Sequence, residues 1–524
     1  MSHAVIPAPM RFDVGAEREF VFRPGTAVAY AGTGIAPLAE RFCSQVMRRT
    51  GLSLLPRAGD PPPGDPHVRI ELAAGFDPRT LPAPTGLSPA GDTPRDERHE
   101  LAIDAGKVVV RAAEPAGVAR GLTTLIQLLA TTPAGGTGEI RVPGARILDA
   151  PRYAWRGLSL DVARTFFTAG EIRRVIDLLE LYKLNVLHLH LTDDQAWRLP
   201  VGRPAGSPEP DGPFFSDQDL RDLVSYAADR FVTVVPEVDT PGHVSALMRL
   251  HPELNTGRNE VEHESPSGRK RRAAWLDPEL PATFGLIGQV LAGLAAIFPG
   301  PYLHIGADEP YGMPHELYAS YVRQVRRCVR AVGKRPLGWQ ESARAGLGPD
   351  DVIQYWISDI ALSPSLPPRA RARMDADLAL SGRDVEMAVA ASVPVIVSPA
   401  SHCYLDVPYA GPPADRAEAD RQGRLGLPVY APQTVAEAFG WEPGEALGAG
   451  GQAQVAGVEA AIWAETISGF DDLSFLLLPR LAGVAHKAWS QPQLSSWPGH
   501  RDRLARHRQL WAHDDLAHFR AFAR

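Results

Sequence analysis

Two adjacent carboxylates, Asp308 and Glu309, are the residues of this sequence whose spacing most directly suggests chemistry. They follow the largely apolar segment 302–305, and Gly306 and Ala307 before them are small enough to let a ligand approach the backbone. On an exposed loop such a pair would only be solvated charge. In a closed pocket one carboxylate raises the pKa of its neighbour, so that one can hold a proton while the other stays ionised. That division of roles is typical of glycosidases, and paired carboxylates are also typical of metal sites.

Polar and aromatic side chains also follow most of the other segments that we expect to form buried strands. These segments are LHLHLTDD at 187–194, VVPEVDTPGH at 234–243, LGWQE at 337–341, QYW at 354–356, SHCYLD at 401–406 and IWAE at 462–465. In a barrel of parallel strands the carboxyl ends meet at one rim, where the active site lies. One polar strand end alone would be a loop or a cap, but so many on one rim predict a deep polar and aromatic pocket.

Several tryptophans stand near these polar segments, namely Trp197, Trp339, Trp356, Trp441 and Trp463. Any one of them alone would more often pack in a core than bind a ligand. Flat indole rings beside carboxylates and an arginine suit a sugar, whose C–H faces stack on the ring while its hydroxyl groups bind polar side chains. The residues expected to contact a substrate in this way are Trp339, Trp356, Trp441 and Trp463.

The elements that would position these residues alternate regularly from Trp155 onward. Short runs rich in β-branched residues begin near residues 157, 186, 232, 302, 336, 352, 395 and 457, and helix-like segments follow most of them. Eight strands with crossover helices predict an α/β fold, a (β/α)8 TIM barrel over 151–490. Residues 1–150 are expected to form a small accessory α/β domain, because the hairpin-like strands HELAID and KVVVRAA precede a helix. Residues 491–524 are expected to pack on the barrel as a C-terminal helical tail.

The composition narrows the possible partners. The 524 residues carry 54 Lys and Arg against 61 Asp and Glu, a net charge of −7, and no half of the chain is strongly basic. This balance argues against nucleic acid or an anionic membrane surface and favours a small neutral ligand. A basic run, GRKRR at 268–272, lies in a polar stretch and is interpreted as a solvated loop.

The cysteines and the apolar segments indicate in which cellular compartment the protein is expected. Cys43, Cys328 and Cys403 are too few and too scattered for a disulfide framework, and no C-x-x-C pair suggests zinc or redox chemistry. No membrane-length apolar run occurs, and the first residues lack the basic segment and apolar core of a signal peptide. The sequence therefore predicts a cytoplasmic protein.

Several motifs occur together in the order found in one enzyme family. They are WRGLSLDVART at 155–165, NVLHLHLTDDQAWR at 185–198, VVPEVDTPGH, YLHIGADE, GWQE, YLD and IWAE. By these motifs the chain resembles the family 20 glycoside hydrolases, the β-N-acetylhexosaminidases. The resemblance implies an exo-acting, retaining enzyme that releases terminal GlcNAc or GalNAc from glycans or glycosides and uses no cofactor or metal. It also implies substrate-assisted catalysis, in which the 2-acetamido oxygen attacks the anomeric carbon to give an oxazolinium ion.

The resemblance also assigns roles to individual residues. Glu309 corresponds to the general acid, and Asp308 to the carboxylate that orients the acetamide and stabilises the charge developing on its N–H. Tyr404 corresponds to a tyrosine that hydrogen-bonds the acetamide oxygen, and Trp339, Trp356 and Trp463 correspond to the walls around the acetamide methyl. The remaining matched positions are Arg156, Asp406 and Glu465 for the sugar hydroxyls, and Asp193 and His243, with Asp239 and His304, for the polar shell behind the acid.

Two other interpretations remain open. A metal-dependent barrel hydrolase could use His188 and His190, whose side chains face the same way on a strand, together with His243 and Asp308. Against it, both strand histidines precede the strand end, and the tryptophans would have no role. A catalytically silent sugar-binding protein would keep the tryptophans but would not need both Asp308 and Glu309.

Overall fold

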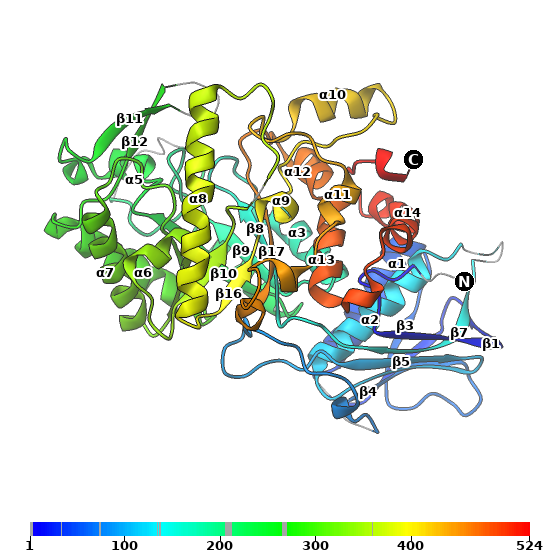
Figure 1. Ribbon diagram of the computed structural model, residues 1–524. Helices are drawn as coiled ribbons and strands as arrows, with labels where there is room; N and C mark the ends of the chain where they lie inside the picture. The colour runs from blue at the N-terminus through cyan, green and yellow to red at the C-terminus, as the bar shows by residue number, and fades with distance from the viewer. Residues whose placement is uncertain are drawn as a thin grey trace.

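The polar strand ends lie on a closed barrel of eight parallel strands (Figure 1). The structure is a computed structural model that describes residues 4–523 except 33, 73–74, 134, 136–137, 205–211, 265–269 and 359. The barrel strands, in order around the barrel, are β8 (Trp155–Asp161), β9 (Val186–His190), β10 (Thr233–Thr240), β13 (Tyr302–Gly306), β14 (Arg335–Trp339), β15 (Val352–Tyr355), β16 (Val395–Val397) and β17 (Val455–Ile462). This confirms the predicted (β/α)8 barrel.

Helices surround the barrel, and most of them pack apolar side chains against it. The longer ones are α3 (Ala169–Leu181), α4 (Asp217–Ala228), α6 (Pro281–Ile297), α7 (His315–Ala331), α8 (Pro368–Ala390), α12 (Phe470–Leu477) and α13 (Arg480–Trp489). Helices α3 and α4 each begin at a capping box, formed by Thr168 with Glu171 and by Ser216 with Asp219. Between β16 and β17 the chain forms the short helices α9 (Ala400–Cys403), α10 (Arg416–Arg424) and α11 (Val435–Phe439). Within the described residues, none of the helices combines the length and apolarity that crossing a membrane requires.

A mixed sheet of seven strands precedes the barrel together with two helices. Its strand order is β1 (Arg11–Phe22), β7 (Ile140–Asp149), β5 (His99–Asp104), β6 (Lys107–Ala112), β4 (His67–Leu72), β2 (Ala27–Tyr30) and β3 (Leu55–Ala58). Neighbouring strands in this order are antiparallel from β1 to β6 and parallel from β6 to β3. Helices α1 (Ala36–Thr50) and α2 (Pro115–Ala130) contact each other and pack on this sheet around a shared apolar core. Helix α2 is buried along almost its whole length, because the barrel covers its other side. There Nε2 of Gln127 donates to the carbonyl of Leu181 at 2.7 Å.

The C-terminal segment packs where the sheet domain and the barrel meet. Helix α14 (Trp497–His513) contacts α1 and α2, and its Trp511 is fully buried. The indole of Trp511 donates to the hydroxyl of Tyr182 at 2.7 Å, and Nε2 of His507 lies 2.6 Å from the carbonyl oxygen of Ala4. The two ends of the described chain are therefore held together (Figure 1).

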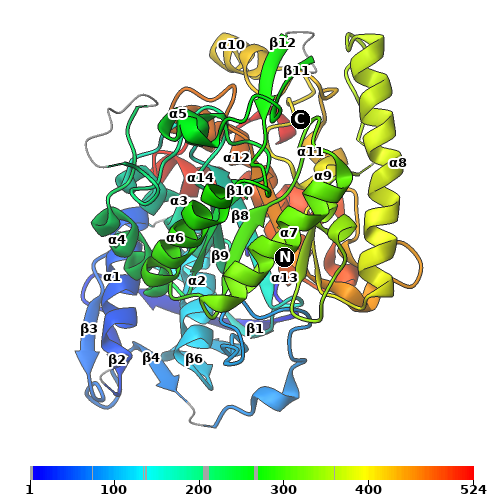
Figure 2. The same cartoon turned by 90° about the vertical axis from the view of Figure 1, so that its left-hand side faces the viewer.

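A β-hairpin stands beside the carboxyl rim of the barrel. Its strands β11 (Glu260–Glu264) and β12 (Lys270–Ala274) lie near α5 (Ser245–Leu250) (Figure 2). Of the basic run at 268–272, residues 268 and 269 lie outside the described residues. The other three belong to β12, which corrects the prediction of a loop there, because they pair with the backbone of β11.

Candidate active site

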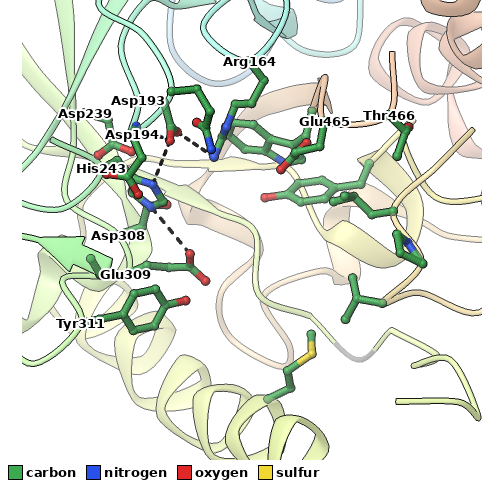
Figure 3. A pocket seen from close by; sticks show the side chains of 18 of the residues that line it. Arg164, Asp193, Asp194, Asp239, His243, Asp308, Glu309, Tyr311, Glu465 and Thr466 are labelled. Atoms are coloured by element: carbon green, nitrogen blue, oxygen red, sulfur yellow. Dashed lines mark hydrogen bonds and ion pairs between the residues drawn. The ribbon is translucent and has the colours of Figure 1, made fainter. Parts of the chain in front are cut away.

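A cavity of about 600 Å³ opens at the carboxyl ends of the barrel strands (Figure 3). Segments that follow different strands supply its lining. The predicted site residues that line it are Asp193, His243, Asp308, Glu309, Trp356, Tyr404, Trp463 and Glu465, together with Arg164, Asp194, Asp239 and Tyr311. The barrel thus brings together side chains that lie up to hundreds of positions apart in the sequence.

A turn with unusual backbone angles after β13 presents the two carboxylates to the cavity. Gly306, Ala307 and Glu309 have φ angles of 68°, 80° and 44°, all in the left-handed region. A Cβ on Gly306 would lie 1.7 Å from Oδ1 of Asp239, so glycine is required for this close approach of β10 and β13. Left-handed backbone at Ala307 and Glu309 costs free energy, and such strain is concentrated at functional sites.

His243 lies among three carboxylates. Its Nε2 is 3.6 Å from Oε2 of Glu309 and 3.7 Å from Oδ2 of Asp308, and its Nδ1 is 3.4 Å from Oδ1 of Asp193 (Figure 3). Burial disfavours the imidazolium, but the charges of Asp193 and Asp239 outweigh it and raise the pKa of His243 well above its usual range. His243 is therefore a cation that offsets the negative charge of the site.

The pKa values of the adjacent carboxylates are moved in opposite directions. Burial, with the charge of Glu309, raises the pKa of Asp308 to about 6. Burial acts in the same direction on Glu309, but the nearby charge of His243 and a hydrogen bond from Tyr311 lower its pKa. Burial and the charge of Asp308 also raise the pKa of Asp239 well above its usual range. Asp308 is thus the carboxyl whose charge changes just below neutral pH.

Aromatic rings form a box in the same cavity, which we call the aromatic box and define by Trp356, Tyr404 and Trp463. Trp356 and Tyr404 are parallel within 4° with centroids 6.0 Å apart, and Trp463 meets Tyr404 edge-on at 6.0 Å. Trp339, the other predicted wall, is fully buried 5.9 Å from Trp463 and donates its indole N–H to Glu237 at 2.8 Å. Trp339 therefore supports the box from behind and is not part of the cavity lining.

The residues that follow β14 hold Trp356 in place, and sequence reasoning assigned them no role. Oε1 of Gln340 accepts the backbone N–H of Trp356 at 2.9 Å, and Nε2 of Gln340 donates to Ser381 of α8 at 2.6 Å. Oε2 of Glu341 accepts the indole N–H of Trp356 at 3.1 Å. The polar pair at the end of the motif GWQE thus positions one ring of the aromatic box.

Arg164 also lines the cavity, and the sequence prediction missed it. Its Nη2 lies 2.7 Å from Oδ2 of Asp193, and its guanidinium lies 5.3 Å from the ring centroid of Trp463. Burial opposes the charge, but Asp193 and Asp161 outweigh it and raise the pKa of Arg164 well above its usual range. The motif WRGLSLDVART contains two arginines, Arg156 and Arg164. The position of Arg164 after the strand could have identified it as the site residue, because reacting groups lie at the carboxyl ends of barrel strands.

Arg156, which was predicted to grip the sugar hydroxyls, does not reach the cavity. It lies at the amino end of β8 and is fully buried. Its Nη2 is 2.6 Å from Oε2 of Glu97, and it donates to the carbonyls of Tyr153 at 2.7 Å and Lys183 at 3.0 Å. Nε of Arg120 binds the same Glu97 at 2.6 Å. The prediction is wrong because Arg156 is an ion-pair partner between the sheet domain and the opposite end of the barrel.

We expect Arg156→Ala to destabilise the protein while leaving the kinetics of the folded molecules unchanged. Breaking a buried ion pair costs about 3–5 kcal/mol, because the remaining charge loses its partner in a water-poor site. Thermal melting together with steady-state kinetics on the folded variant measures both effects. Arg164→Ala is the matched control, since it should lower kcat/KM. A similar fall in kcat/KM for folded Arg156→Ala would contradict this assignment.

Two further predicted contacts lie away from the cavity surface. Trp441 stacks on His402 with centroids 5.5 Å apart and an interplanar angle of 7°, so its prediction as a substrate contact is wrong. Asp406 is fully buried, and its Oδ1 accepts the backbone N–H of Trp463 at 3.4 Å. Burial and the charge of Glu465 raise the pKa of Asp406 to about 8. Asp406 therefore lies, largely neutral, behind the lining instead of on it.

Of the strand histidines of the metal hypothesis, His188 lies inside the barrel beneath the cavity, whereas His190, the last residue of β9, also lines the cavity. His188 approaches Glu459 at 2.9 Å and Glu237 at 3.1 Å, and His190 approaches Glu237 at 2.7 Å. Burial opposes their protonation, but these carboxylates raise the pKa of His188 to about 9 and that of His190 well above its usual range. Each group of donor atoms close enough to hold an ion, among the described residues, contains His188, His190 or His243. The carboxylates that favour the imidazolium form here oppose metal binding, because a histidine must be neutral to bind a metal ion.

Comparison with known proteins finds matches of one family to both the barrel and the domain that precedes it. Residues 153–315 and 310–492 match Glycosyl hydrolase family 20, catalytic domain, and residues 2–150 match Glycosyl hydrolase family 20, domain 2. The chain is 38% identical over 432 residues to a Beta-N-acetylhexosaminidase of Cellulomonas fimi, which covers 81% of this chain and 79% of that protein. The structure of the GH20 beta-N-acetylhexosaminidase from Streptomyces coelicolor A3(2) is similar with a TM-score of 0.77 at 29% identity, covering 99% of this chain and 97% of that one. A Streptomyces plicatus N-acetyl-beta-hexosaminidase in complex with Thio-NAglucal gives a TM-score of 0.78 at 30% identity, covering 99% and 96%.

Proposed function

Because this chain belongs to glycosyl hydrolase family 20, we propose that it removes single terminal N-acetylhexosamine residues, GlcNAc or GalNAc, with retention of configuration. The chain is a glycoside hydrolase, and its relatives support β-N-acetylhexosaminidase activity. The proposed nucleophile is the acetamide of the substrate itself.

The observation that carries this proposal is the placement of Asp308 beside Glu309 in one cavity with the aromatic box. The carbonyl oxygen of the acetamide attacks C1 while the glycosidic C–O bond breaks and Glu309 gives its proton to the leaving oxygen. Asp308 accepts the acetamide N–H and stabilises the positive charge of the oxazolinium ion. Glu309 then removes a proton from the water that opens the ring, so that the sugar leaves as the β-anomer.

His243 supports Glu309 as an acid. The free enzyme holds a proton on His243, 3.6 Å from Oε2 of Glu309, as an ion pair. A substrate that excludes water from the pair makes this separation of charge less favourable. The proton can then pass to Glu309 and on to the leaving oxygen. Asp193, which contacts both His243 and Arg164, fixes the ring for this transfer.

The far end of the cavity supports exo-action. Arg164 and Glu465 both line the cavity near Trp463, where a guanidinium and a carboxylate can grip neighbouring hydroxyl groups of the terminal sugar. In this proposal the hydroxyl groups held by Arg164 and Glu465 cannot carry a further sugar. Chitooligosaccharides should therefore shorten from the nonreducing end.

We expect the enzyme to cleave an aryl β-N-acetylglucosaminide, with or without EDTA, and to barely cleave the matching aryl β-glucoside. The glucoside has no acetamide and therefore no nucleophile. Proton NMR of the first-formed sugar should show the β-anomer before mutarotation. An initial α-anomer, or comparable turnover of the glucoside, would contradict the substrate-assisted mechanism, and loss of activity in EDTA with recovery on adding zinc would favour the metal hypothesis. Binding without turnover would identify a silent sugar-binding protein.

A further inference from the structure

One side of the cavity is lined by aliphatic side chains, which we call the apolar wall: Leu366, Met374, Leu427 and Val429. Two segments far apart in the sequence build it. The backbone N–H of Ser363 donates to the carbonyl of Val429 at 2.9 Å, which places the segment before α8 against the loop at 427–429. Helix α8 begins immediately afterwards and carries Met374 to the same cavity.

The apolar wall is continuous with the aromatic box. Met374, Leu427 and Val429 pack in one apolar cluster with Trp356, Tyr404 and Trp463. A sugar seated in the aromatic box would therefore meet the apolar wall as a neighbouring surface of the cavity.

The surroundings of Glu309 place the apolar wall on the leaving-group side. Arg373 precedes Met374 on α8, and its guanidinium lies 4.9 Å from the ring centroid of Tyr311, whose hydroxyl binds Glu309. Asp377, one turn further along α8, is close enough for the charge of Glu309 to help raise its pKa. A general acid must face the glycosidic oxygen, so the group attached to that oxygen points toward this part of α8.

The apolar wall is only partly covered by the protein itself. Met374, Leu427 and Val429 are half-buried, whereas Leu366 is buried. A ligand that covers these side chains removes apolar surface from water, and each methylene it buries is worth about a fourfold gain in affinity. A second sugar would instead place hydroxyl groups against side chains that offer no hydrogen bond. Ser365 and Tyr430 border the apolar wall, whereas the polar lining residues Gln195 and Arg272 lie on other elements, the loop after β9 and strand β12.

We propose that the apolar wall is a binding site for a hydrophobic leaving group, so that this enzyme prefers alkyl or aryl glycosides of N-acetylhexosamine to a disaccharide. The inference rests on the proposed function, because Glu309 must protonate the leaving oxygen for the apolar wall to be the leaving-group side. Met374, Leu427 and Val429 would then determine leaving-group specificity without taking part in the chemistry.

A series of unactivated substrates tests this proposal. Release of GlcNAc is measured from methyl, butyl and hexyl β-N-acetylglucosaminides and from N,N′-diacetylchitobiose. The alkyl leaving groups differ little in chemical reactivity, so a change in kcat/KM reports binding along the chain. Burying two of the five added methylenes predicts that kcat/KM rises at least about tenfold from methyl to hexyl. The kcat/KM on the hexyl glycoside should also exceed that on the disaccharide.

Substitutions that keep the volume of a side chain but make it polar test whether the apolar wall causes the preference for the hexyl glycoside. Met374→Gln and Leu427→Asn should each lower the ratio of hexyl to methyl kcat/KM at least about threefold. Met387→Gln is the matched control, because Met387 lies on the same helix, is 38% exposed and is not among the residues that line the cavity. It should leave the ratio at the parent value.

The outcomes separate this proposal from the proposed function. Three results would overturn the apolar leaving-group site while GlcNAc release continues. They are a kcat/KM that does not change along the alkyl series, a higher kcat/KM on the disaccharide than on the hexyl glycoside, and an unchanged hexyl-to-methyl ratio in both polar variants. Failure to release GlcNAc from every substrate would refute the proposed function, and this inference with it.

Discussion

Glu309→Gln should lower kcat/KM on alkyl glycosides on the order of 10²- to 10⁴-fold, which is the usual worth of a positioned general acid. Glutamine keeps the shape of the side chain, but it has no proton of suitable acidity to give to the leaving oxygen. An activated aryl glycoside needs less protonation, so its loss should be much smaller.

The decisive measurement for Glu309→Gln is the ratio of rates on two substrates with good and poor leaving groups. Addition of azide to the variant should speed the aryl substrate if the missing group is also the base of the second step. Equal losses on both substrates would contradict the assignment of Glu309 as the acid. Gln340→Ala is a useful control, because Gln340 positions Trp356 and should affect both substrates alike.

Asp308→Asn should lower kcat/KM about 10²- to 10³-fold on aryl and alkyl substrates alike. The carboxylate acts on the acetamide N–H, not on the leaving group, so leaving-group reactivity cannot compensate for its loss. An amide of the same shape cannot balance the positive charge of the oxazolinium ion. A loss confined to alkyl substrates would contradict this role and would make Asp308 the acid instead.

The pH profile of the parent enzyme provides an independent measurement of Asp308. Its pKa is raised to about 6 in the folded protein, so the carboxylate is the main form above that pH and the neutral acid below it. If the carboxylate is the active form, kcat/KM should fall about tenfold per pH unit as the pH drops below about 6. A profile that is flat from pH 7 to pH 4 would contradict this.

The comparison of Arg156 with Arg164 shows where sequence reasoning was limited. Both belong to the motif WRGLSLDVART, and the motif alone does not say which one faces the substrate. A strand of a TIM barrel has a structural end and a functional end. Arg156 starts β8 and pairs with Glu97 of the sheet domain, whereas Arg164 follows it and pairs with Asp193. Only the strand limits and the partners distinguish the two.

Trp441 and Asp406 illustrate the same limit in another way. Trp441 lies in the described segment between β16 and β17, where short helices α10 and α11 alternate with loops, and its ring stacks on His402 instead of a substrate. Asp406 is the last residue of the motif SHCYLD, yet the backbone of Trp463 covers it. Residue type and position along the chain predict that a side chain lies near the site. They do not predict whether it lines the cavity or packs behind the lining.

By itself, the sequence determined the barrel and the chemistry at its rim. Alternating apolar runs and helices imply parallel strands, and parallel strands bring their carboxyl ends to one rim. The adjacent carboxylates Asp308 and Glu309 had to lie there for this reason. The tertiary structure decided which distant group lies beside these two carboxylates. His243, which Asp193 holds, lies within 3.7 Å of both. It also decided that α8 and the loop at 427–429 form one apolar wall. Such pairings depend on how loops from different strands pack in three dimensions, and no local pattern in the chain encodes that packing.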